Sequence, residues 1–319
     1  MKRYFILIIS VWFMILNCPA QNDYVLVIHG GAGNIQVNRM TEAQSAEYRD
    51  KLKEALQAGE KILESGGDAL DAVVAAVLVL EDCPLFNAGK GAVFNSEGKH
   101  ELDASIMDGK SMKAGAVAGT TTIRNPILAA RLVMDSSAHV MLSGRGADLF
   151  AGLHGLEVVD NTYFDSEKGE KEYLRIKEKL ENEGRKGTVG AVALDKQGNL
   201  AAATSTGGMT FKQYGRIGDS PIIGAGTYAN NESCAVSCTG HGEYFIRNAV
   251  AYDVSARMLY LKETMEQATE YIINKKLKDQ GATGGLIAVD KNGNIAMPFN
   301  TPGMFRGFVK EGEKRVVEF

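Results

Sequence analysis

The chain has 319 residues, of which 45% are hydrophobic and 23% are charged, and its formal net charge at pH 7 is -4. This composition is typical of a soluble globular protein that can bury a sizeable core in one large or two small domains. Lys and Arg are interspersed with Asp and Glu, so the sequence offers no basic stripe for nucleic acid and does not predict a polyanionic partner.

The first 20 residues are typical of a secretory signal peptide. Lys2 and Arg3 precede an apolar run from Tyr4 to Leu16, and the small residue Ala20 stands before a polar segment. We therefore expect cleavage after Ala20 and a secreted or periplasmic protein, with no membrane association after signal removal. A membrane anchor is disfavoured because the run is shorter than the roughly 20 residues of a spanning helix. A lipoprotein signal ending at Cys18 is the other alternative.

The N-terminal region predicts a strand, a glycine-rich loop and a helix. Tyr24 to Ile28 is a short apolar strand that leads into the loop His29 to Gly33. Apolar and small residues then recur at helical spacing, at Leu52, Leu56, Gly59 and Leu63.

A second helix is predicted directly after the first. Gly66 and Gly67 end the first helix, and Asp68 begins the next, with Asp71 three residues later as a near capping box. Ala69 to Leu80 is apolar on nearly every face, so we expect this helix to be buried.

A charged segment divides the chain. From Asp165 to Lys186, 14 of 22 residues are charged, which predicts a linker with at best one solvated helix. Beyond it the pattern becomes β, with strands from Thr188 to Leu194 and from Leu200 to Thr206 joined by a turn. The segment from Gly285 to Met297 repeats this hairpin pattern.

Two helices are predicted between these hairpins, from Phe245 to Tyr260 and from Met265 to Leu277. Helices together with strand pairs joined by Gly-centred turns predict an α+β fold, in which helices cover antiparallel sheet.

Three cysteines follow the signal peptide: Cys83, Cys234 and Cys238. The last two lie in a strand-like stretch whose ends are about 13 Å apart when extended, which is too far for a disulfide. We expect all three to be buried and free. No Cys/His cluster has zinc spacing, so the sequence does not predict a metal-dependent mechanism.

The junction between Gly187 and Thr188 is typical of a self-cleavage site. A charged linker meets a strand that starts with threonine, and the small glycine leaves its carbonyl open to attack. An N-terminal threonine carries its own base, because its α-amino group has a pKa of about 7.7 to 8.0. Cleavage here would therefore supply nucleophile and base in one residue.

Other polar groups are predicted to lie near Thr188. Thr206 ends the neighbouring strand, and Thr239 precedes the glycine-rich segment that leads into a helix. Backbone N–H groups in such a segment can bind a developing oxyanion. Arg216 and Asp219 place a guanidinium and a carboxylate in one loop, which suits an amino acid head group.

The sequence resembles the plant-type asparaginases, also called isoaspartyl peptidases, of the N-terminal-nucleophile hydrolases. The resemblance runs from His29 to about Phe308 and is weakest in the charged segment. Its motifs, in chain order, are HGGAG at 29–33, GGDALDAV at 66–73, PLFNAGKGAVFN at 84–95, HELDASIMDG at 100–109, GTVGAVALD at 187–195, GNLAAATSTGG at 198–208 and TGHGE at 239–243.

This resemblance implies catalytic roles at matching positions. Thr188 is implied to be the nucleophile that self-cleavage after Gly187 exposes, and Thr206 to hydrogen-bond it. Thr239 and the N–H of Gly240 are implied to form the oxyanion hole.

The resemblance also implies substrate and ion contacts. Arg216 is implied to bind the substrate α-carboxylate, and Asp219, with Gly242, its α-ammonium. Thr239 and Gly240 are implied to contact the substrate as well, and Asn87 to steady the cleavage loop. Backbone carbonyls of about Leu80 to Ala92 match a family loop that holds a structural sodium ion, and no other cofactor is implied.

The family also implies the overall organisation: one composite domain, folded as a four-layer αββα sandwich. Residues 21–187 would form an α subunit that ends in the charged segment of about 165–187, and residues 188–319 a β subunit. Two αβ units would pair as a homodimer, and the substrate would be asparagine or a β-aspartyl dipeptide.

Several alternatives are weighed against this interpretation. Export favours the related glycosylasparaginases, whereas HGGAG belongs to the isoaspartyl peptidase branch. A periplasmic amino-acid-binding protein could use Arg216 and Asp219 without any cleavage. The glycine-rich loop at 29–33 is not followed by the Lys-Ser/Thr pair of a nucleotide-binding site. Asp103 and Asp108 could be the paired carboxylates of a glycosidase, but the sequence shows no other feature of such a site. We interpret His29 and His241 as structural.

Overall fold

The computed structural model describes residues 22–35, 40–179 and 187–319; the predicted signal peptide and its cleavage site lie outside these ranges. Its strands are β1 (Val25–Gly33), β2 (Leu102–Asp108), β3 (Ala114–Thr120), β4 (Met141–Ser143), β5 (Val189–Leu194), β6 (Leu200–Thr206), β7 (Thr227–Ala229), β8 (Cys234–Gly240), β9 (Gly284–Asp290), β10 (Ile295–Ala296), β11 (Gly303–Lys310) and β12 (Val316–Glu318).

The helices complete the secondary structure. They are α1 (Glu42–Glu64), α2 (Ala69–Glu81), α3 (Pro126–Ser136), α4 (Gly144–Leu153), α5 (Glu167–Lys179), α6 (Gly242–Asn248), α7 (Val250–Ala256) and α8 (Met265–Tyr271). Short 3-10 turns occur at η2 (Gly89–Gly91) and η3 (Asn161–Phe164), and π-helical turns η4 (Arg257–Leu261) and η5 (Ile272–Leu277) continue α7 and α8. Within the described ranges, no helix is long and apolar enough to cross a membrane.

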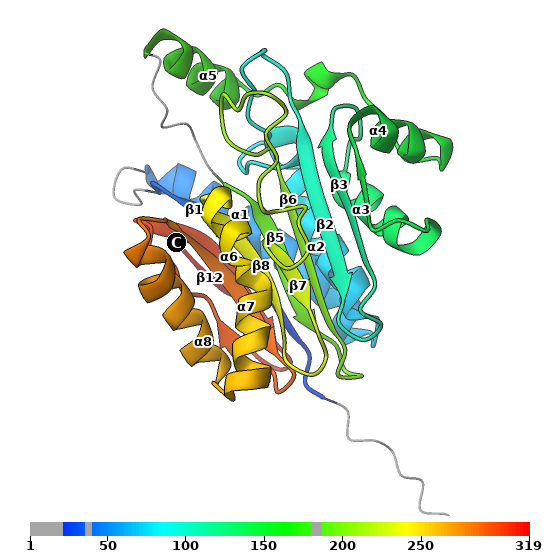
Figure 1. Ribbon diagram of the computed structural model, residues 1–319, viewed down its shortest axis with the longest axis vertical. Coiled ribbons are helices and arrows are strands. Elements are labelled where there is room, and N and C mark those ends of the chain that lie inside the picture. The colour runs from blue at the N-terminus through cyan, green and yellow to red at the C-terminus, as the bar shows by residue number, and fades with distance from the viewer. Residues whose placement is uncertain (1–21, 36–39, 180–186) are drawn as a thin grey trace, which may run out of the picture.

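Two sheets pack face to face between two layers of helices (Figure 1). The larger sheet has the strand order β12-β11-β1-β5-β6-β2-β3-β4, and the smaller has the order β10-β9-β8-β7. Helices α1 to α3 cover the outer face of the larger sheet, and α7 and α8 cover the smaller. Every named pair is antiparallel except β3 with β4. This confirms the predicted α+β class and its four layers.

Alternation along the central strands sends their side chains into two separate cores. On β6, Ala201 and Ala203 pack against α1 to α3, whereas Leu200 and Ala202 pack against the smaller sheet. The same alternation puts Thr204 and Thr206 between the two sheets. The polar end of β6 therefore faces the smaller sheet.

The glycine-rich segment after Ile28 was predicted to be a loop, and this prediction is wrong. β1 continues to Gly33 and pairs with β11 throughout, with a bulge between His29 and Gly31. Gly31 has φ of 107°, a backbone conformation that residues with a side chain rarely adopt. The glycines thus allow a bulged strand, which a search for alternating side chains does not detect.

The capping box predicted at the start of α2 does not form. Asp68 makes no side-chain cap, and Asp71 pairs with Arg131 instead. The N–H of Ala69 donates to Oδ2 of Asp195, 3.1 Å away in the β5–β6 turn. A distant residue therefore caps this buried helix.

The helix predicted from Phe245 to Tyr260 is interrupted. Ala249 adopts a left-handed conformation, with φ of 46°, and separates α6 from α7. The first N–H groups of α7 donate to the carbonyls of Ala225 and Gly224, at 3.1 and 2.8 Å. At this break, hydrogen bonds to a distant segment thus take the place of the hydrogen bonds that a continuous helix would make.

The charged segment contains helix α5, which lies against the body of the protein. Ile176 is buried, and the ring of Tyr173 lies 5.5 Å from Phe94 and 5.8 Å from Phe211, between centroids. Residues 180–186 of the predicted linker lie outside the described ranges.

Replacing Asp195 by Ala should destabilise the protein more than replacing Asp290 by Ala. The two aspartates accept matching backbone hydrogen bonds in equivalent turns: Asp195 from Gln197 and Asn199, and Asp290 from Asn292 and Asn294. Of the two, only Asp195 also caps α2. We expect the difference in the free energy of unfolding, measured with urea, to be about 1–2 kcal/mol. Equal losses would show that the cap contributes nothing.

Candidate active site

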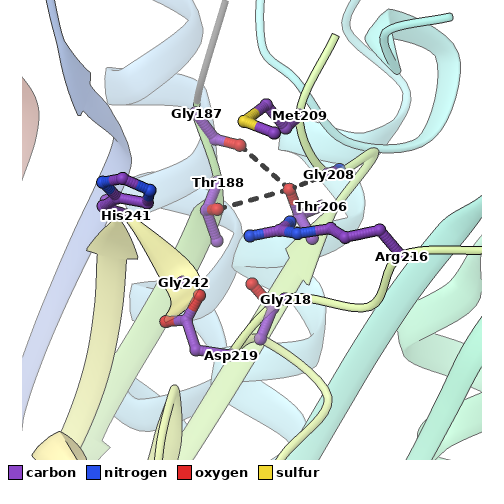
Figure 2. A pocket seen from close by; sticks show the side chains of 12 residues that line it. Gly187, Thr188, Thr206, Gly208, Met209, Arg216, Gly218, Asp219, His241 and Gly242 are labelled. Atoms are coloured by element: carbon purple, nitrogen blue, oxygen red, sulfur yellow. Dashed lines mark hydrogen bonds between the residues drawn. The ribbon is translucent and has the colours of Figure 1, made fainter. Parts of the chain in front are cut away.

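Strand register brings Thr188 and Thr206 together. Val189 pairs with Ser205 across β5 and β6, so the preceding Thr188 faces Thr206 on the surface between the sheets. The Thr188 hydroxyl donates to Thr206 Oγ1 at 3.3 Å, and the Thr206 hydroxyl donates to the Gly187 carbonyl at 2.9 Å. The N–H of Gly208 donates to Thr206 Oγ1 at 2.9 Å. Figure 2 shows Thr206 at the centre of these contacts.

Asn87 holds the Gly187 carbonyl from the other side. Its Nδ2 donates to Gly187 O at 2.8 Å and to Gly208 O at 2.6 Å, while its Oδ1 accepts from the N–H of Val93 at 3.0 Å. The carbonyl between Gly187 and Thr188 thus accepts two hydrogen bonds, from Asn87 and Thr206. Such an arrangement would stabilise negative charge on that oxygen.

Arg216 and Asp219 reach the same pocket from the loop between β6 and β7 (Figure 2). Glycines allow this approach. A Cβ on Gly242 would lie 2.7 Å from Arg216 Nη2 and 2.9 Å from Asp219 Oδ1, and one on Gly218 would lie 2.8 Å from Arg216 Nη1. The head-group residues predicted from the sequence therefore do lie beside Thr188.

The ion-pair partner of Arg216 is Glu243, to which the sequence analysis assigned no role. Arg216 Nε and Nη2 donate to the two carboxylate oxygens of Glu243 at 2.9 and 3.0 Å. Burial alone raises the pKa of Glu243, but the hydrogen bonds and charge of Arg216 outweigh it and lower that pKa to about 2. The sequence feature that could have drawn attention to Glu243 is its position at the end of the TGHGE motif.

Asp219 has no such partner. Its side chain is buried, and its Oδ2 has no hydrogen-bond donor among the described residues. Burial raises the pKa of Asp219 to about 7, although the charge of Arg216 opposes the shift. A buried carboxylate that lacks a donor is suited to binding a cationic group.

Thr239 and Gly240 lie at the end of β8, where Gly240 lines the pocket and Thr239 is fully buried. Thr239 Oγ1 accepts from the N–H of Ala32 at 3.1 Å, so its own hydrogen is available to donate. His241 also lines the pocket, and its Nε2 lies 3.4 Å from Glu243 Oε2. Thr206, Arg216, Asp219 and Gly240 thus line one pocket with Thr188, whereas Thr239 is not among the residues that line it.

His29 is buried below the pocket. Its Nδ1 lies 3.0 Å from the Thr188 carbonyl and its Nε2 lies 3.0 Å from Ser237 Oγ. Burial lowers the pKa of His29 to about 3, so the ring is neutral. Asp103 is buried on β2 and accepts from the N–H of Gly119 at 2.8 Å, whereas Asp108 binds backbone N–H groups in a turn.

The cysteines behave as predicted, since Cys83, Cys234 and Cys238 are all buried and free. Over residues 22–35, 40–179 and 187–319, no group of three or more His, Cys, Asp or Glu side chains gathers as metal ligands would.

Comparisons with known proteins agree on one family. The family model described as Asparaginase matches residues 22–318. The chain is 51% identical to an isoaspartyl peptidase of Escherichia coli (strain K12), over 91% of this chain and 94% of that protein. It is 50% identical to an isoaspartyl peptidase of Salmonella typhimurium, over 92% and 97%. It is 42% identical to an isoaspartyl peptidase/L-asparaginase of Xenopus laevis, over 92% and 94%.

Replacing Asp219 by Asn should stabilise the substrate-free protein above neutral pH. A carboxyl whose pKa is raised from 3.8 to about 7 contributes stability that is present below pH 4 and is lost as the pH rises through 7. Asn cannot ionise, so the variant should exceed the wild type by up to about 4 kcal/mol at pH 8 and match it near pH 4. Unfolding free energies measured across this range test this; parallel pH profiles would contradict it.

Proposed function

The chain belongs to the asparaginase family of hydrolases, and on that premise we propose that it is an isoaspartyl peptidase and L-asparaginase that cuts itself before Thr188. The new N-terminal threonine would then be its nucleophile. Two consecutive hydrogen bonds carry this proposal: the Thr188 hydroxyl donates to Thr206, and the Thr206 hydroxyl donates to the Gly187 carbonyl.

In the self-cleavage that we propose, Thr188 Oγ1 attacks the carbonyl carbon of Gly187. The Thr188 hydroxyl proton passes to Thr206 Oγ1 as the Thr206 proton moves to the Gly187 oxygen, along the two contacts described above. Asn87 donates to the same oxygen. The C–N bond then breaks with protonation of the Thr188 nitrogen, and water hydrolyses the resulting ester. The products are chains that end at Gly187 and begin at Thr188.

In substrate hydrolysis, the α-amino group of Thr188 would accept the hydroxyl proton as the oxygen attacks the side-chain carbonyl of the substrate. A β-aspartyl ester forms, and the amino group returns the proton to the leaving amine. Thr239 and the N–H of Gly240 would donate to the oxyanion. Water then releases aspartate, so each turnover consumes one water and yields one amine.

Arg216 and Asp219 would bind the α-carboxylate and α-ammonium of the substrate head group. A guanidinium can bind a carboxylate through two parallel hydrogen bonds, and Asp219 Oδ2, which has no donor among the described residues, complements an ammonium. Both groups occur on asparagine and on β-aspartyl dipeptides. Binding of the ammonium would ionise Asp219, because an adjacent positive charge offsets the cost of its burial.

We propose that the loop from Leu80 to Ala92 holds a structural sodium ion. A Cβ on Gly89 would lie 2.3 Å from the Glu81 carbonyl oxygen, and one on Gly91 would lie 1.9 Å from that of Phe86. Backbone carbonyl oxygens of this loop thus pack closely against its glycines, and a hard cation prefers oxygen ligands. Its role would be to rigidify the loop that carries Asn87.

Export and assembly are also part of the proposal. The charged, apolar and small-residue pattern that ends at Ala20 supports secretion or delivery to the periplasm. We further propose that the protein acts without another cofactor and pairs as a homodimer of αβ units.

Replacing Thr188 by Ala should abolish both cleavage and turnover, because the side chain then lacks a nucleophilic oxygen. Intact mass spectrometry with N-terminal sequencing should find two chains in the wild type, the second beginning at Thr188, and one chain in the variant. T188S keeps a hydroxyl and should still cleave. A T188A protein that hydrolyses asparagine would show that the nucleophile is another residue.

Replacing Arg216 by Lys should raise KM for β-aspartyl dipeptides by about 10- to 100-fold with a smaller change in kcat. The charge is kept, but a lysine cannot make two parallel hydrogen bonds to the substrate carboxylate. Steady-state kinetics on fully processed protein measure the effect. An unchanged KM would mean that another residue binds the carboxylate.

A further inference from the structure

A row of polar residues crosses the larger sheet directly below the proposed catalytic residues. His29 on β1 pairs with Gly190 on β5, Gly190 pairs with Thr204 on β6, and Thr204 pairs with Ser105 on β2. These positions lie two residues along each strand from the row that contains Thr188 and Thr206. Alternation therefore turns both rows toward the smaller sheet.

The smaller sheet completes this row with two hydroxyls, Ser237 and Thr227. Ser237 Oγ lies 3.0 Å from His29 Nε2 and 2.7 Å from Thr204 Oγ1. It occupies the space that Gly190 leaves, since a Cβ on Gly190 would lie 2.0 Å from it. Thr227 Oγ1 donates to Thr204 Oγ1 at 2.6 Å.

The far end of the row reaches the loop that carries Asp219. Ser105 Oγ lies 2.8 Å from Thr227 Oγ1 and 2.6 Å from the carbonyl oxygen of Ser220. A continuous line of contacts at hydrogen-bond distance thus joins the carbonyl of Thr188 to the carbonyl of Ser220, and the single hydrogen of Ser105 serves either Ser220 or Thr227. We call His29, Ser237, Thr204, Thr227 and Ser105 the buried hydroxyl network; all five are fully buried.

The positions of the hydrogen atoms in this network can be assigned by starting from the contact between His29 and the Thr188 carbonyl. The Thr188 carbonyl can only accept, so His29 Nδ1 carries the hydrogen, and Nε2 of the neutral ring must accept from Ser237. Ser237 has then used its hydrogen, so Thr204 donates to Ser237 and Thr227 donates to Thr204 in turn. The hydrogen bonds from His29 to Thr227 therefore have a defined direction, whereas Ser105 can donate to Ser220 or to Thr227. Removing one of these hydroxyls leaves buried neighbours unsatisfied.

We propose that the buried hydroxyl network sets the separation between the nucleophile and the head-group site, and thereby selects aspartyl over glutamyl substrates. This inference rests on the proposed function. The network is attached at one end to Thr188 and at the other to the residue that follows Asp219. Its members are positioning residues, because none of them lines the pocket.

The substrate chemistry explains why such a separation matters. β-Aspartyl and γ-glutamyl compounds carry the same head group, but one additional methylene separates it from the scissile carbonyl. A site that only fills space discriminates against one methylene by about 10- to 200-fold. Discrimination by length requires that the two ends of the site hold their spacing, because reaction depends on near-contact between nucleophile and carbonyl.

The test compares Thr204→Val with Thr204→Ser. Valine keeps the shape but removes the hydroxyl, whereas serine keeps the hydroxyl and removes a methyl. The probes are β-aspartyl-leucine and γ-glutamyl-leucine, which share a leaving group, with activity expressed per chain processed at Thr188. We expect T204V to lower the ratio of kcat/KM values, β-aspartyl over γ-glutamyl, by about tenfold. T204S should keep the wild-type ratio.

Two further variants separate positioning from general stability. Ser105→Ala breaks the network at its other end and should lower the ratio as T204V does. Ser255→Ala removes a buried hydroxyl that pairs with Ser233 at 2.7 Å, away from the site, and should leave the ratio unchanged. Melting temperatures measured in parallel show whether the ratio follows stability instead.

The outcomes distinguish this inference from the proposed function. Wild-type protein that cleaves neither dipeptide would overturn the proposed function and the inference with it. Wild-type protein that prefers β-aspartyl-leucine, with the same ratio in T204V and S105A, would overturn the inference alone. A ratio that falls equally in T204V, T204S and S255A would also overturn it, since packing would then explain the loss.

Discussion

The pairing register of β5 with β6 is the constraint on which the rest of the site depends. Because Val189 pairs with Ser205, Thr188 faces Thr206 between the two sheets. A slip of β5 by one residue would turn the Thr188 hydroxyl toward the helices and away from Thr206. Apolar residues hold the register, since Leu194 and Leu200 at the turn and Ala191 with Ala203 further along fill separate cores. The geometry of the proposed cleavage junction is therefore a consequence of ordinary sheet packing.

The site costs folding stability in two ways: it buries acidic side chains, and it needs glycines where neighbouring atoms leave no room for a Cβ. Burial raises the pKa of Asp219 to about 7 and that of Glu81, behind β6, to about 8. Glu81 Oε1 accepts from Ser205 Oγ at 2.6 Å, so it supports β6 from the side opposite Thr204 and Thr206. Arg216 is compensated by Glu243, whereas Oδ2 of Asp219 is left without a donor among the described residues. This asymmetry makes Asp219 Oδ2 suited to binding a cationic group.

Local patterns predicted most elements of the fold, and their failures have identifiable physical causes. The β6 strand, the buried helix after Asp68 and the paired hairpins follow from periodicity and turn residues. The bulged end of β1 was missed because glycines give no alternating pattern. The cap of α2 and the break at Ala249 were missed because Asp195 and the carbonyls of residues 224–225 lie far away in the chain.

The sequence by itself indicated the family and the residue types that the proposed chemistry needs, and it predicted the junction before Thr188 as a cleavage site. It could do so because those residues stand in recognisable local motifs. Only the tertiary structure decided which groups meet: Glu243 with Arg216, Asn87 with the Gly187 carbonyl, and the hydroxyls that join Thr188 to Ser220. These contacts depend on the register and stacking of two sheets. Hydrogen-bond partners distant in sequence have no local signature, so the spacing of residues along the chain cannot reveal them.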